Sequence, residues 1–347
     1  MEYTIAVLPG DGIGPELTQA TVRVLGAVQQ GFGIPLHLAW VEGGDRCAAK
    51  TGVPLPDETI EIIRASHACL KGPVGETAAD VIVKLRILFD LYAGIRPLKS
   101  YPNTPALRSD IDLLFVRENT EGLYKGQEFA VDDDTMVAMR VITRAACERI
   151  ATYAFEAARN RQKALKVTAV HKSNVLRKTD GLFVQTCRAV AQQYPDIRLE
   201  ECYVDAAAMQ LIKAPQDFDV IVTTNLFGDI LSDEGAALVG GLGMAPGANI
   251  GDAFALFEPI HGTAPDIAGQ NVANPTSMIL AAGLMLDWLG KTHSDSACLN
   301  AAVSITHAVS KTLQAGILTR DLGGTEGTAG FGEAVAERVL GKVMVDG

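Results

Sequence analysis

Two aspartates in the segment TTNLFGDILSDEGAALVGGLG (residues 223–243) have the spacing of a metal site. Asp229 and Asp233 are four residues apart, so on a helix both carboxylates lie on one face. Two like charges this close repel each other unless a cation lies between them. Oxygen ligands of this kind suit Mg²⁺ or Mn²⁺ rather than zinc. A solvated acidic helix would show the same pattern, but the apolar strand expected at 220–224 places this helix where open α/β sheets bind ligands. Asp205, which follows another expected strand, could complete the site.

Three arginines form a second candidate cluster. Arg86, Arg96 and Arg117 each lie where an apolar segment meets a helix or a turn. A guanidinium binds a carboxylate bidentately, so the three side chains predict a pocket for a di- or tricarboxylate. One such arginine alone would more often belong to a structural ion pair. The net charge of −11 argues against nucleic acid or an anionic membrane as the partner. A small anion is still compatible, because a few local arginines can reverse the field inside a cleft.

Two side chains are candidate proton carriers. Tyr124 ends the run RENTEGLY, and Lys172 directly follows the strand expected at 165–170. A lysine near a divalent cation has a lowered pKa and can act as a base. Either residue could instead be a plain surface or core residue, and His171 and His261 are interpreted first as positional groups.

The segment FEPIHGTAPDIAGQNVANP (257–275) is a candidate nucleotide loop. Its glycines and small residues let backbone amides approach a nucleotide closely, and Asp266 could accept hydrogen bonds from ribose hydroxyls. The turn LPGDGIGPEL (8–17) has the glycine spacing G-x-G-x-G, whereas the Rossmann motif is G-x-G-x-x-G. No acidic residue follows about 20 positions later, so a Rossmann site is not expected.

Strand-like and helix-like segments alternate along the 347 residues, which predicts an α/β fold. The expected strands are 3–8, 35–41, 66–71, 111–116, 135–142, 165–170, 197–204 and 218–224, and the clearest helices are 143–160 and 275–289. The second helix is expected to have Asn274 as N-cap, Pro275 at its first position and Gly290 just beyond its end. The proline-rich segment 96–110 predicts a domain crossing, and the strand-like end of 125–142 suggests an arm reaching away from the core.

The remaining composition predicts a soluble, cytoplasmic protein. The six cysteines are scattered without a C-x-x-C pair, which indicates neither a disulfide framework nor a zinc site. No basic region precedes the first apolar run, so a secretory signal is not expected. The apolar stretch 278–289 is too short to cross a membrane and contains Asp287.

Together these motifs resemble those of the β-decarboxylating dehydrogenases, the isocitrate/3-isopropylmalate dehydrogenase family. The resemblance spans nearly the whole chain and rests on GDGIGPE, LRxxxDLYAxxRP, RENTEGLY, HKSNVL, VDAAAMQL, TTNLFGDILSD, HGTAPDIAGQNVANP and DLGG. It implies an α/β, isopropylmalate dehydrogenase-like two-domain fold that is not a Rossmann fold. Residues 1–92 and 240–347 would form the NAD-binding domain. Residues 93–239 would form the substrate, metal and dimerisation domain, with a dimerisation arm.

The resemblance also implies roles for individual residues. The substrate would be bound by Val83, Arg86, Arg96, Arg117 and Asn174. Mg²⁺ or Mn²⁺ would be bound by Asp229 and Asp233 together with Asp205 of the partner subunit. NAD would be bound by Glu258, His261, Gly262, Thr263, Ala264, Pro265, Asp266, Ile267 and Asn274. The pair Asp266–Ile267 resembles the NAD-dependent members, since the NADP-dependent ones have lysine and tyrosine there. Lys172 of the partner subunit would relay the proton of the substrate hydroxyl, and Tyr124 would protonate the enol. The active form would be a homodimer with shared sites, with pairing into tetramers left open.

The group at C3 of the substrate would be read by the helix before Arg86. On α-helical spacing Ala79, Ile82 and Val83 share the face of that arginine, and this face is apolar. An unpaired substrate carboxylate on such a wall costs roughly 2 kcal/mol or more. The pattern favours a 3-alkylmalate, with 3-isopropylmalate first; homoisocitrate or isocitrate dehydrogenase is the alternative. A non-catalytic regulatory subunit and a nucleotide-binding module without chemistry are alternatives of another class. Gly94 departs from the asparagine usual in this family.

Overall fold

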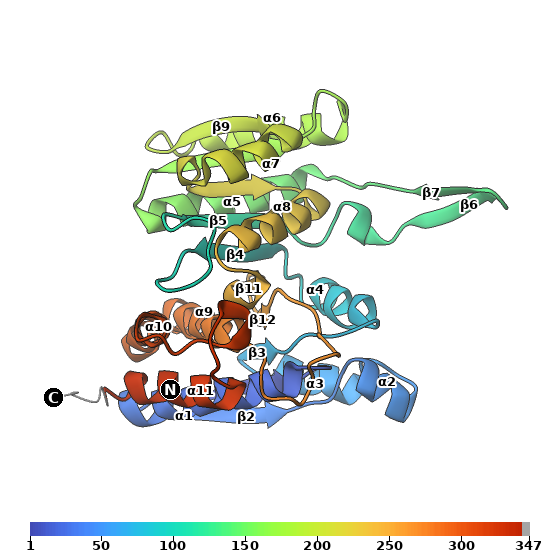
Figure 1. The fold of residues 1–347 in the computed structure, drawn as a ribbon. Coiled ribbons are helices and arrows are strands. Elements are labelled where there is room, and N and C mark those ends of the chain that lie inside the picture. Colours follow the sequence, from blue (N-terminus) through green and yellow to red (C-terminus); the bar gives the residue numbers. More distant parts are fainter. Residues whose placement is uncertain (342–347) are drawn as a thin grey trace.

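The computed structural model describes residues 1–341 and contains one large mixed sheet covered by helices on both faces (Figure 1). The strands are β1 (Tyr3–Leu8), β2 (Leu36–Trp40), β3 (Ala68–Lys71), β4 (Ala93–Lys99), β5 (Asp112–Glu118), β6 (Glu128–Asp132), β7 (Thr135–Ala138), β8 (Lys166–His171), β9 (Arg198–Tyr203), β10 (Val220–Thr223), β11 (Pro246–Ile250) and β12 (Ala255–Pro259). The α-helices are α1 (Gly14–Phe32), α2 (Asp45–Thr51), α3 (Asp57–Ala65), α4 (Lys84–Leu88), α5 (Arg144–Arg161), α6 (Thr179–Ala191), α7 (Val204–Lys213), α8 (Asn225–Leu238), α9 (Thr276–His293), α10 (Ser296–Gln314) and α11 (Thr328–Val339). Short elements are the π-helix η1 (Ala79–Val83) and the 3₁₀ turns η2 (Leu123–Lys125), η3 (Pro215–Asp217), η4 (Leu242–Met244) and η5 (Arg320–Leu322).

The ten strands of the main sheet have the order β2-β1-β3-β12-β11-β4-β5-β10-β8-β9. Five of them (β4, β5, β8, β9 and β10) come from within 93–239, and the other five from outside that segment. The two halves meet where β11 pairs antiparallel with β4. The strand order of this sheet in residues 1–341 differs from the Rossmann order, and the predicted α/β class is confirmed. The division of functions between two domains stays a prediction.

The buried apolar residues explain where a site can form. On the face covered by α1, α5, α6, α9, α10 and α11, one continuous apolar cluster runs along both halves of the sheet. On the opposite face the core is divided: one cluster lies under α7 and α8, another under α3 and α4. Polar side chains therefore converge between α8 and α4, where the apolar packing of this face is interrupted.

All eight predicted strands are present; β1 has the predicted bounds and the other seven have shifted ends, whereas β4, β6, β11 and β12 were not predicted. The segment 96–110 was interpreted as a connector because of its prolines, but Pro97 lies within β4 in the middle of the sheet and is in register with Leu114. Prolines are uncommon in central strands, and for this reason the prolines of this segment led to the wrong prediction of a connector.

Helix 275–289 was predicted with the wrong ends. It begins at Thr276 with Pro275 as its N-cap residue, and it continues through Gly290 to His293. Gly290 serves packing, because a Cβ there would lie 2.7 Å from the Leu299 side chain on α10. The apolar stretch 278–289 is the buried core of α9. No helix in residues 1–341 is long and apolar enough to cross a membrane.

The predicted arm is a two-stranded hairpin. Strands β6 and β7 pair antiparallel and extend away from the rest of the molecule (Figure 1). Most of its apolar side chains are exposed; Phe129 is 51% and Met136 70% accessible. A hairpin of this kind is marginally stable alone, so these side chains are expected to contact another surface.

Candidate active site

Helix α8 presents Asp229 and Asp233 on one face, as their spacing predicted. The helix begins directly after the buried strand β10, with Thr224 at its N-cap position. Arg96 of β4 lies between the two acids: its Nη2 donates to Asp229 Oδ1 (2.9 Å), and its Nη1 donates to Asp233 Oδ1 (3.1 Å) and to Ser232 Oγ (2.6 Å). The carboxylates therefore need a positive charge between them, and in this structure a guanidinium supplies it.

Arg117 and Tyr124 contact the first of these acids from the other side. Both donate hydrogen bonds to Asp229, and Arg117 also donates to Asn225 Oδ1 through Nη2 (2.6 Å). The Arg117 side chain is almost completely buried because α8 approaches it closely at Gly228. A Cβ at Gly228 would lie 2.7 Å from Arg117 Cγ, so a glycine is required there.

Arg86 of α4 belongs to a buried polar network under this cluster. Its Nε donates to Asn249 Oδ1 (2.8 Å), and its Nη2 lies 3.4 Å from Glu258 Oε1. Lys71 Nζ is 2.8 Å from the other Glu258 oxygen, and Asn119 Nδ2 donates to Asn249 Oδ1 (2.7 Å). Burial alone would raise the pKa of Glu258, but Lys71 and Arg86 lower it to about 2. Sequence reasoning missed Lys71, Asn119 and Asn249.

The three arginines are close enough to influence one another. Burial and the charges of Arg96 and Arg86 lower the pKa of Arg117 to about 9. Burial also lowers the pKa of Arg86; Glu258 opposes that shift and Arg96 adds to it. The mutual repulsion of the three guanidinium groups makes the cluster a good receptor for an anion with several carboxylates.

The two α8 acids differ in their affinity for protons. Burial would raise the pKa of Asp229, but Arg117 and Arg96 hold it below its usual value. Burial and the charge of Asp229 raise the pKa of Asp233, with Arg96 acting in the opposite direction. Asp233 is thus incompletely compensated, and its side chain is 47% exposed. An all-oxygen pair with one open, under-compensated carboxylate fits a hard divalent cation.

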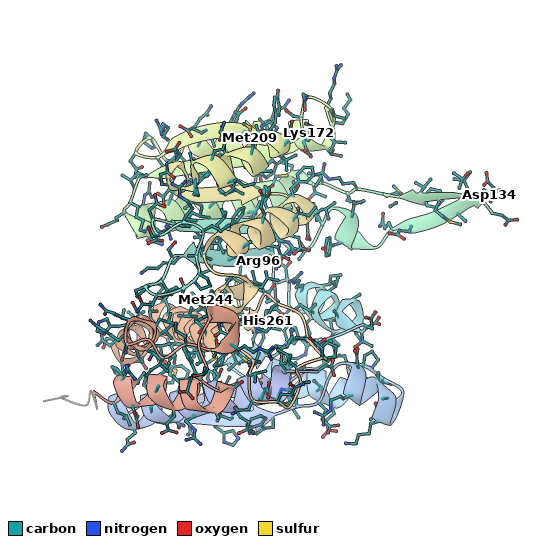
Figure 2. The ribbon with its side chains drawn as sticks, viewed as in Figure 1. Arg96, Asp134, Lys172, Met209, Met244 and His261 are labelled. Atoms are coloured by element: carbon teal, nitrogen blue, oxygen red, sulfur yellow. The ribbon has the colours of Figure 1, made fainter. Side chains whose placement is uncertain are left out.

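Lys172 and Asp205 lie in another part of the chain. Lys172 follows β8, Asp205 lies in the first turn of α7, and Lys172 Nζ is 2.5 Å from Asp205 Oδ1. Figure 2 shows Lys172 and Met209 of α7 far along the molecule from Arg96. Among residues 1–341 of one chain, no three His, Cys, Asp or Glu side chains are grouped as metal ligands. One chain therefore does not bring Asp205 to the α8 acids. Asn174 lies in the exposed turn after Lys172.

The predicted nucleotide loop borders a cavity of about 590 Å³. Five of the predicted cofactor residues line it: His261, Gly262, Ala264, Ile267 and Asn274. His261 Nε2 is buried without a hydrogen-bond partner in the described residues, and burial lowers the pKa of this histidine. A neutral ring with an unpaired nitrogen at a cavity wall fits a polar heterocyclic ligand such as a nucleotide. Arg320 and Asp321 also line this cavity and were not predicted.

The other predicted cofactor residues lie elsewhere in or near the loop. Pro265 and Asp266 are exposed and do not line the cavity, and Glu258 belongs to the buried arginine network. The Thr263 carbonyl accepts a hydrogen bond from Ile13 N (2.9 Å) in the turn GDGIGPE. This turn supports the loop.

Two residues of that turn explain its sequence. A Cβ at Gly12 would lie 2.0 Å from the Thr263 carbonyl oxygen, so the loop can approach only a glycine. Asp11 is buried, and its carboxylate accepts hydrogen bonds from the backbone N–H groups of Asp45 (2.8 Å), Arg46 (3.0 Å) and Gly75 (3.2 Å). The segment GDGIGPE thus has a structural role: it packs the turn after β1 against the candidate nucleotide loop.

A family model described as isocitrate/isopropylmalate dehydrogenase matches residues 4–335. The chain belongs to this family. The 3-isopropylmalate/3-methylmalate dehydrogenase of Methanocaldococcus jannaschii is 52% identical over 97% of this chain and 99% of its own length. The isocitrate/homoisocitrate dehydrogenase of Thermus thermophilus is 46% identical over 97% of this chain and 98% of its own length. The crystal structure of isocitrate dehydrogenase from Methylococcus capsulatus has a TM-score of 0.90 at 44% identity, covering 97% of this chain and 99% of the other.

Family membership gives the site its general chemistry. Members are decarboxylating dehydrogenases that act on small hydroxy acids with a divalent metal and NAD(P). The arginine cluster, the α8 acids and the cavity at His261 have the residue types that such a reaction requires.

The helix expected to read the substrate side chain is not regular. Residues Ala79–Val83 form a π-helix before α4, so the face assigned to Ala79, Ile82 and Val83 on α-helical spacing is shifted. Ile82 and Val83 are half-buried, whereas Ala79 is exposed. π-Turns are frequent at functional sites, and this one lies directly before Arg86. Val83 as a substrate contact stays a prediction.

Proposed function

We propose that this protein catalyses the NAD-dependent oxidative decarboxylation of a 3-alkylmalate, with 3-isopropylmalate as the preferred substrate. In the net reaction the C2 alcohol is oxidised to a ketone: the hydrogen on C2 goes to NAD⁺ as hydride, and the hydroxyl hydrogen leaves as a proton. The carboxylate on C3 then leaves as CO₂ and is replaced by a proton. The observation that carries the proposal is the convergence of Arg96, Arg117 and Tyr124 on Asp229, with Arg86 beside them.

The charge and the proton affinity of each side chain suggest its role in the proposed reaction. Arg86, Arg96 and Arg117 bind and orient the malate carboxylates. Burial and the hydrogen bond to Asp229 raise the pKa of Tyr124, so its hydroxyl keeps a proton that it can deliver to C3. Lys172 takes the proton of the C2 hydroxyl. Asp229 and Asp233, with Asp205 of the partner subunit, would hold Mg²⁺ or Mn²⁺, which would supply positive charge against developing negative charge. The loop around His261 would hold NAD, which would serve as the hydride acceptor.

Two copies of the chain would build each site. Asp205, Met209 and Ile212 follow one another at helical spacing on α7, and Met209 and Ile212 are 52% and 58% exposed. Ile230 on the neighbouring α8 is 58% exposed. Exposed apolar side chains on two adjacent helices, with the hairpin beside them, suit a symmetric homodimer. Such a dimer would bring Lys172 and Asp205 of the partner subunit to the α8 acids.

A complementation experiment tests the shared site. Asp229→Asn and Lys172→Met are each expected to be inactive as pure homodimers. If Asp229 and Lys172 of different chains share a site, a dimer of one variant with the other contains one intact site. Random mixing then restores about a quarter of the wild-type activity. If the two residues act within one chain, the mixture stays inactive.

The substrate and the nucleotide need a direct comparison. NADH production is measured with isopropylmalate, methylmalate, malate, tartrate, isocitrate and homoisocitrate, each with Mg²⁺ or Mn²⁺. Faster turnover of homoisocitrate or isocitrate would reverse the proposed order. NADP is included because Arg320 lines the nucleotide cavity, although Asp266 should disfavour a 2′-phosphate. Activity of the purified homomer also excludes a regulatory subunit. We place the protein in the cytoplasm, consistent with six unpaired cysteines.

A further inference from the structure

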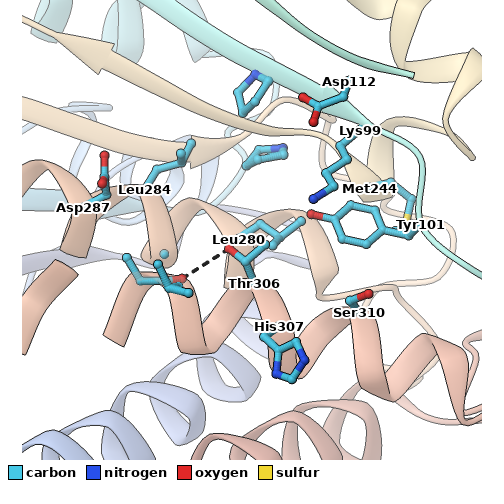
Figure 3. Close-up of a pocket in the computed structure, with 15 residues that line it drawn as sticks. Lys99, Tyr101, Asp112, Met244, Leu280, Leu284, Asp287, Thr306, His307 and Ser310 are labelled. Carbon is cyan, nitrogen blue, oxygen red and sulfur yellow. Dashed lines mark hydrogen bonds between the residues drawn. The ribbon is translucent and has the colours of Figure 1, made fainter. Parts of the chain in front are cut away.

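A second cavity, here called the rear cavity, has a volume of about 470 Å³ and lies between strand β4 and the helices α9 and α10 (Figure 3). Its walls come from Pro97 and Lys99 of β4, from Tyr101 just beyond that strand, and from α9 and α10. Successive strand residues point to opposite faces. Arg96 points toward the α8 acids, so Pro97 and Lys99 face the other way. The rear cavity is therefore separate from the candidate active site.

Most of the rear cavity is apolar. Met244, Leu280, Leu284 and Val303 line it, and the first two are buried while Val303 stands at the surface with 70% exposure. The volume falls within the range of small-molecule sites, and apolar walls with a few polar groups are the usual lining of such sites. A ligand here would have a compact apolar body.

The polar end of the rear cavity is cationic. The Lys99 ammonium lies 6.0 Å from the centre of the Tyr101 ring, and within residues 1–341 it has no carboxylate partner. Figure 3 shows the Lys99 amine and the Tyr101 hydroxyl at the same end of the cavity. Burial and the nearby Asp112 raise the pKa of Tyr101, so its hydroxyl remains a donor. Two donors, one of them charged, face the same space.

The acids at the cavity do not cancel this charge. Asp112 is 3.0 Å from Arg161 and also pairs with Lys163, and Asp287 is 2.6 Å from Lys291. Each acid therefore has its own cation, and Lys99 is left to attract an anion. His307 of α10 supplies a further polar group on the wall.

We propose that the rear cavity binds a small monocarboxylate with a branched or aromatic apolar body, its carboxylate on Lys99 and Tyr101 and its body against Leu280 and Leu284. This site is distinct from the site of the proposed reaction and does not depend on it. Free polar donors at one end and apolar walls at the other define the ligand class by charge and shape.

The test is direct binding of 4-methylpentanoate to the full-length protein, measured by isothermal titration calorimetry without substrate or NAD. The neutral 4-methylpentanamide has the same apolar body and is the matched ligand control. Lys99→Met removes the charge, and Val303→Glu adds a like charge at the exposed rim without disturbing a buried position. Lys311→Met, on the exposed surface of α10, is the matched variant control.

We expect one carboxylate bound per chain, with tenfold or greater loss of affinity for the amide and for the Lys99→Met and Val303→Glu variants. Lys311→Met should bind as the wild type does. Unchanged affinity in Lys99→Met would place the ligand in another site, such as the arginine cluster, and overturn the proposal. Absence of saturable binding to the wild type would overturn it as well.

Discussion

The buried ion pair between Lys71 and Glu258 offers a quantitative test of how the site is supported. The substitution Lys71→Met keeps most of the volume and removes the charge. Both side chains are nearly inaccessible, at 2% and 12%, and their charged atoms are 2.8 Å apart. Without Lys71, Glu258 keeps only the longer contact of 3.4 Å to Arg86 as a charged partner.

The expected size of the effect follows from two independent estimates. Removing one partner of a buried ion pair costs about 3–5 kcal/mol of stability, because the other charge is left uncompensated. The pKa of Glu258 falls from 4.5 to about 2 in the folded protein. That shift corresponds to roughly 3 kcal/mol, an upper bound that Lys71 shares with Arg86 and Asn249. Both values indicate a loss of several kcal/mol.

The direction in which this stability effect changes with pH can also be predicted. Because folding lowers the pKa of Glu258, its contribution is fully present above pH 4.5 and is lost as the pH falls toward 2. Lys71→Met should therefore be less stable than the wild type at pH 7. Between pH 4.5 and pH 3 its unfolding free energy should fall less steeply with decreasing pH than that of the wild type. The assay is urea unfolding followed by circular dichroism across this pH range.

A surface pair of the same type is the control. Lys50 and Glu42 are 3.0 Å apart, with side chains 67% and 62% exposed, so Lys50→Met should cost at most about 0.5 kcal/mol. Adding Glu258→Gln to Lys71→Met should restore part of the lost stability, because it removes the uncompensated charge. A cost below about 1 kcal/mol for Lys71→Met, or a double variant less stable than the single one, would refute this reasoning.

Three further outcomes are expected. Gly12→Ala should raise the KM for NAD tenfold or more, because the new Cβ displaces the nucleotide loop; steady-state kinetics check this, with the open helical position Gly26→Ala as control. Gly290→Ala should lower the unfolding free energy by about 1–3 kcal/mol through its clash with α10, whereas Gly181→Ala, with open space around it, should raise it by about 0.5–1 kcal/mol. Met209→Asp should convert the proposed dimer to monomers in sedimentation analysis, and an unchanged dimer would exclude α7 from the interface.

The sequence allowed the fold class to be predicted because most strands alternate with helices and show their own apolar pattern. Of the strands that escaped prediction, β4, β11 and β12 lie in the middle of the main sheet, and β6 lies in the hairpin. Pro97 interrupts the pattern of β4, and β11 begins with Pro246 and Gly247. Their pairing depends on strands distant in sequence, such as Ala248 with Ile95, and no local signal reports such a contact.

The sequence indicated those parts of the candidate site whose residue types and local spacing suggest a chemical role by themselves. The α8 acids and the arginines could be proposed from the sequence because the acids have helical spacing directly after an apolar strand, and because three arginines lie at the ends of apolar segments. The support of Arg86 was not found, since Asn249 is 163 residues away in the chain and Lys71 looks like the end of an ordinary strand. Such partners are brought together only by the order of the strands.

The arrangement around Asp229 joins two clusters that the sequence presented as separate. Arg96 and Arg117 were expected to hold substrate, and Asp229 and Asp233 to hold metal, yet in one chain the arginines pair with the acids. Each set supplies the charge that the other requires. A dicarboxylate can therefore bind the arginines only if a cation binds the acids at the same time. If only one of the two ligands binds, either the acids or the arginines are left partly buried without a compensating charge. Electrostatics thus couples the proposed substrate and metal positions within one network, and the buried ion pair of Lys71 and Glu258 beneath Arg86 supports that network.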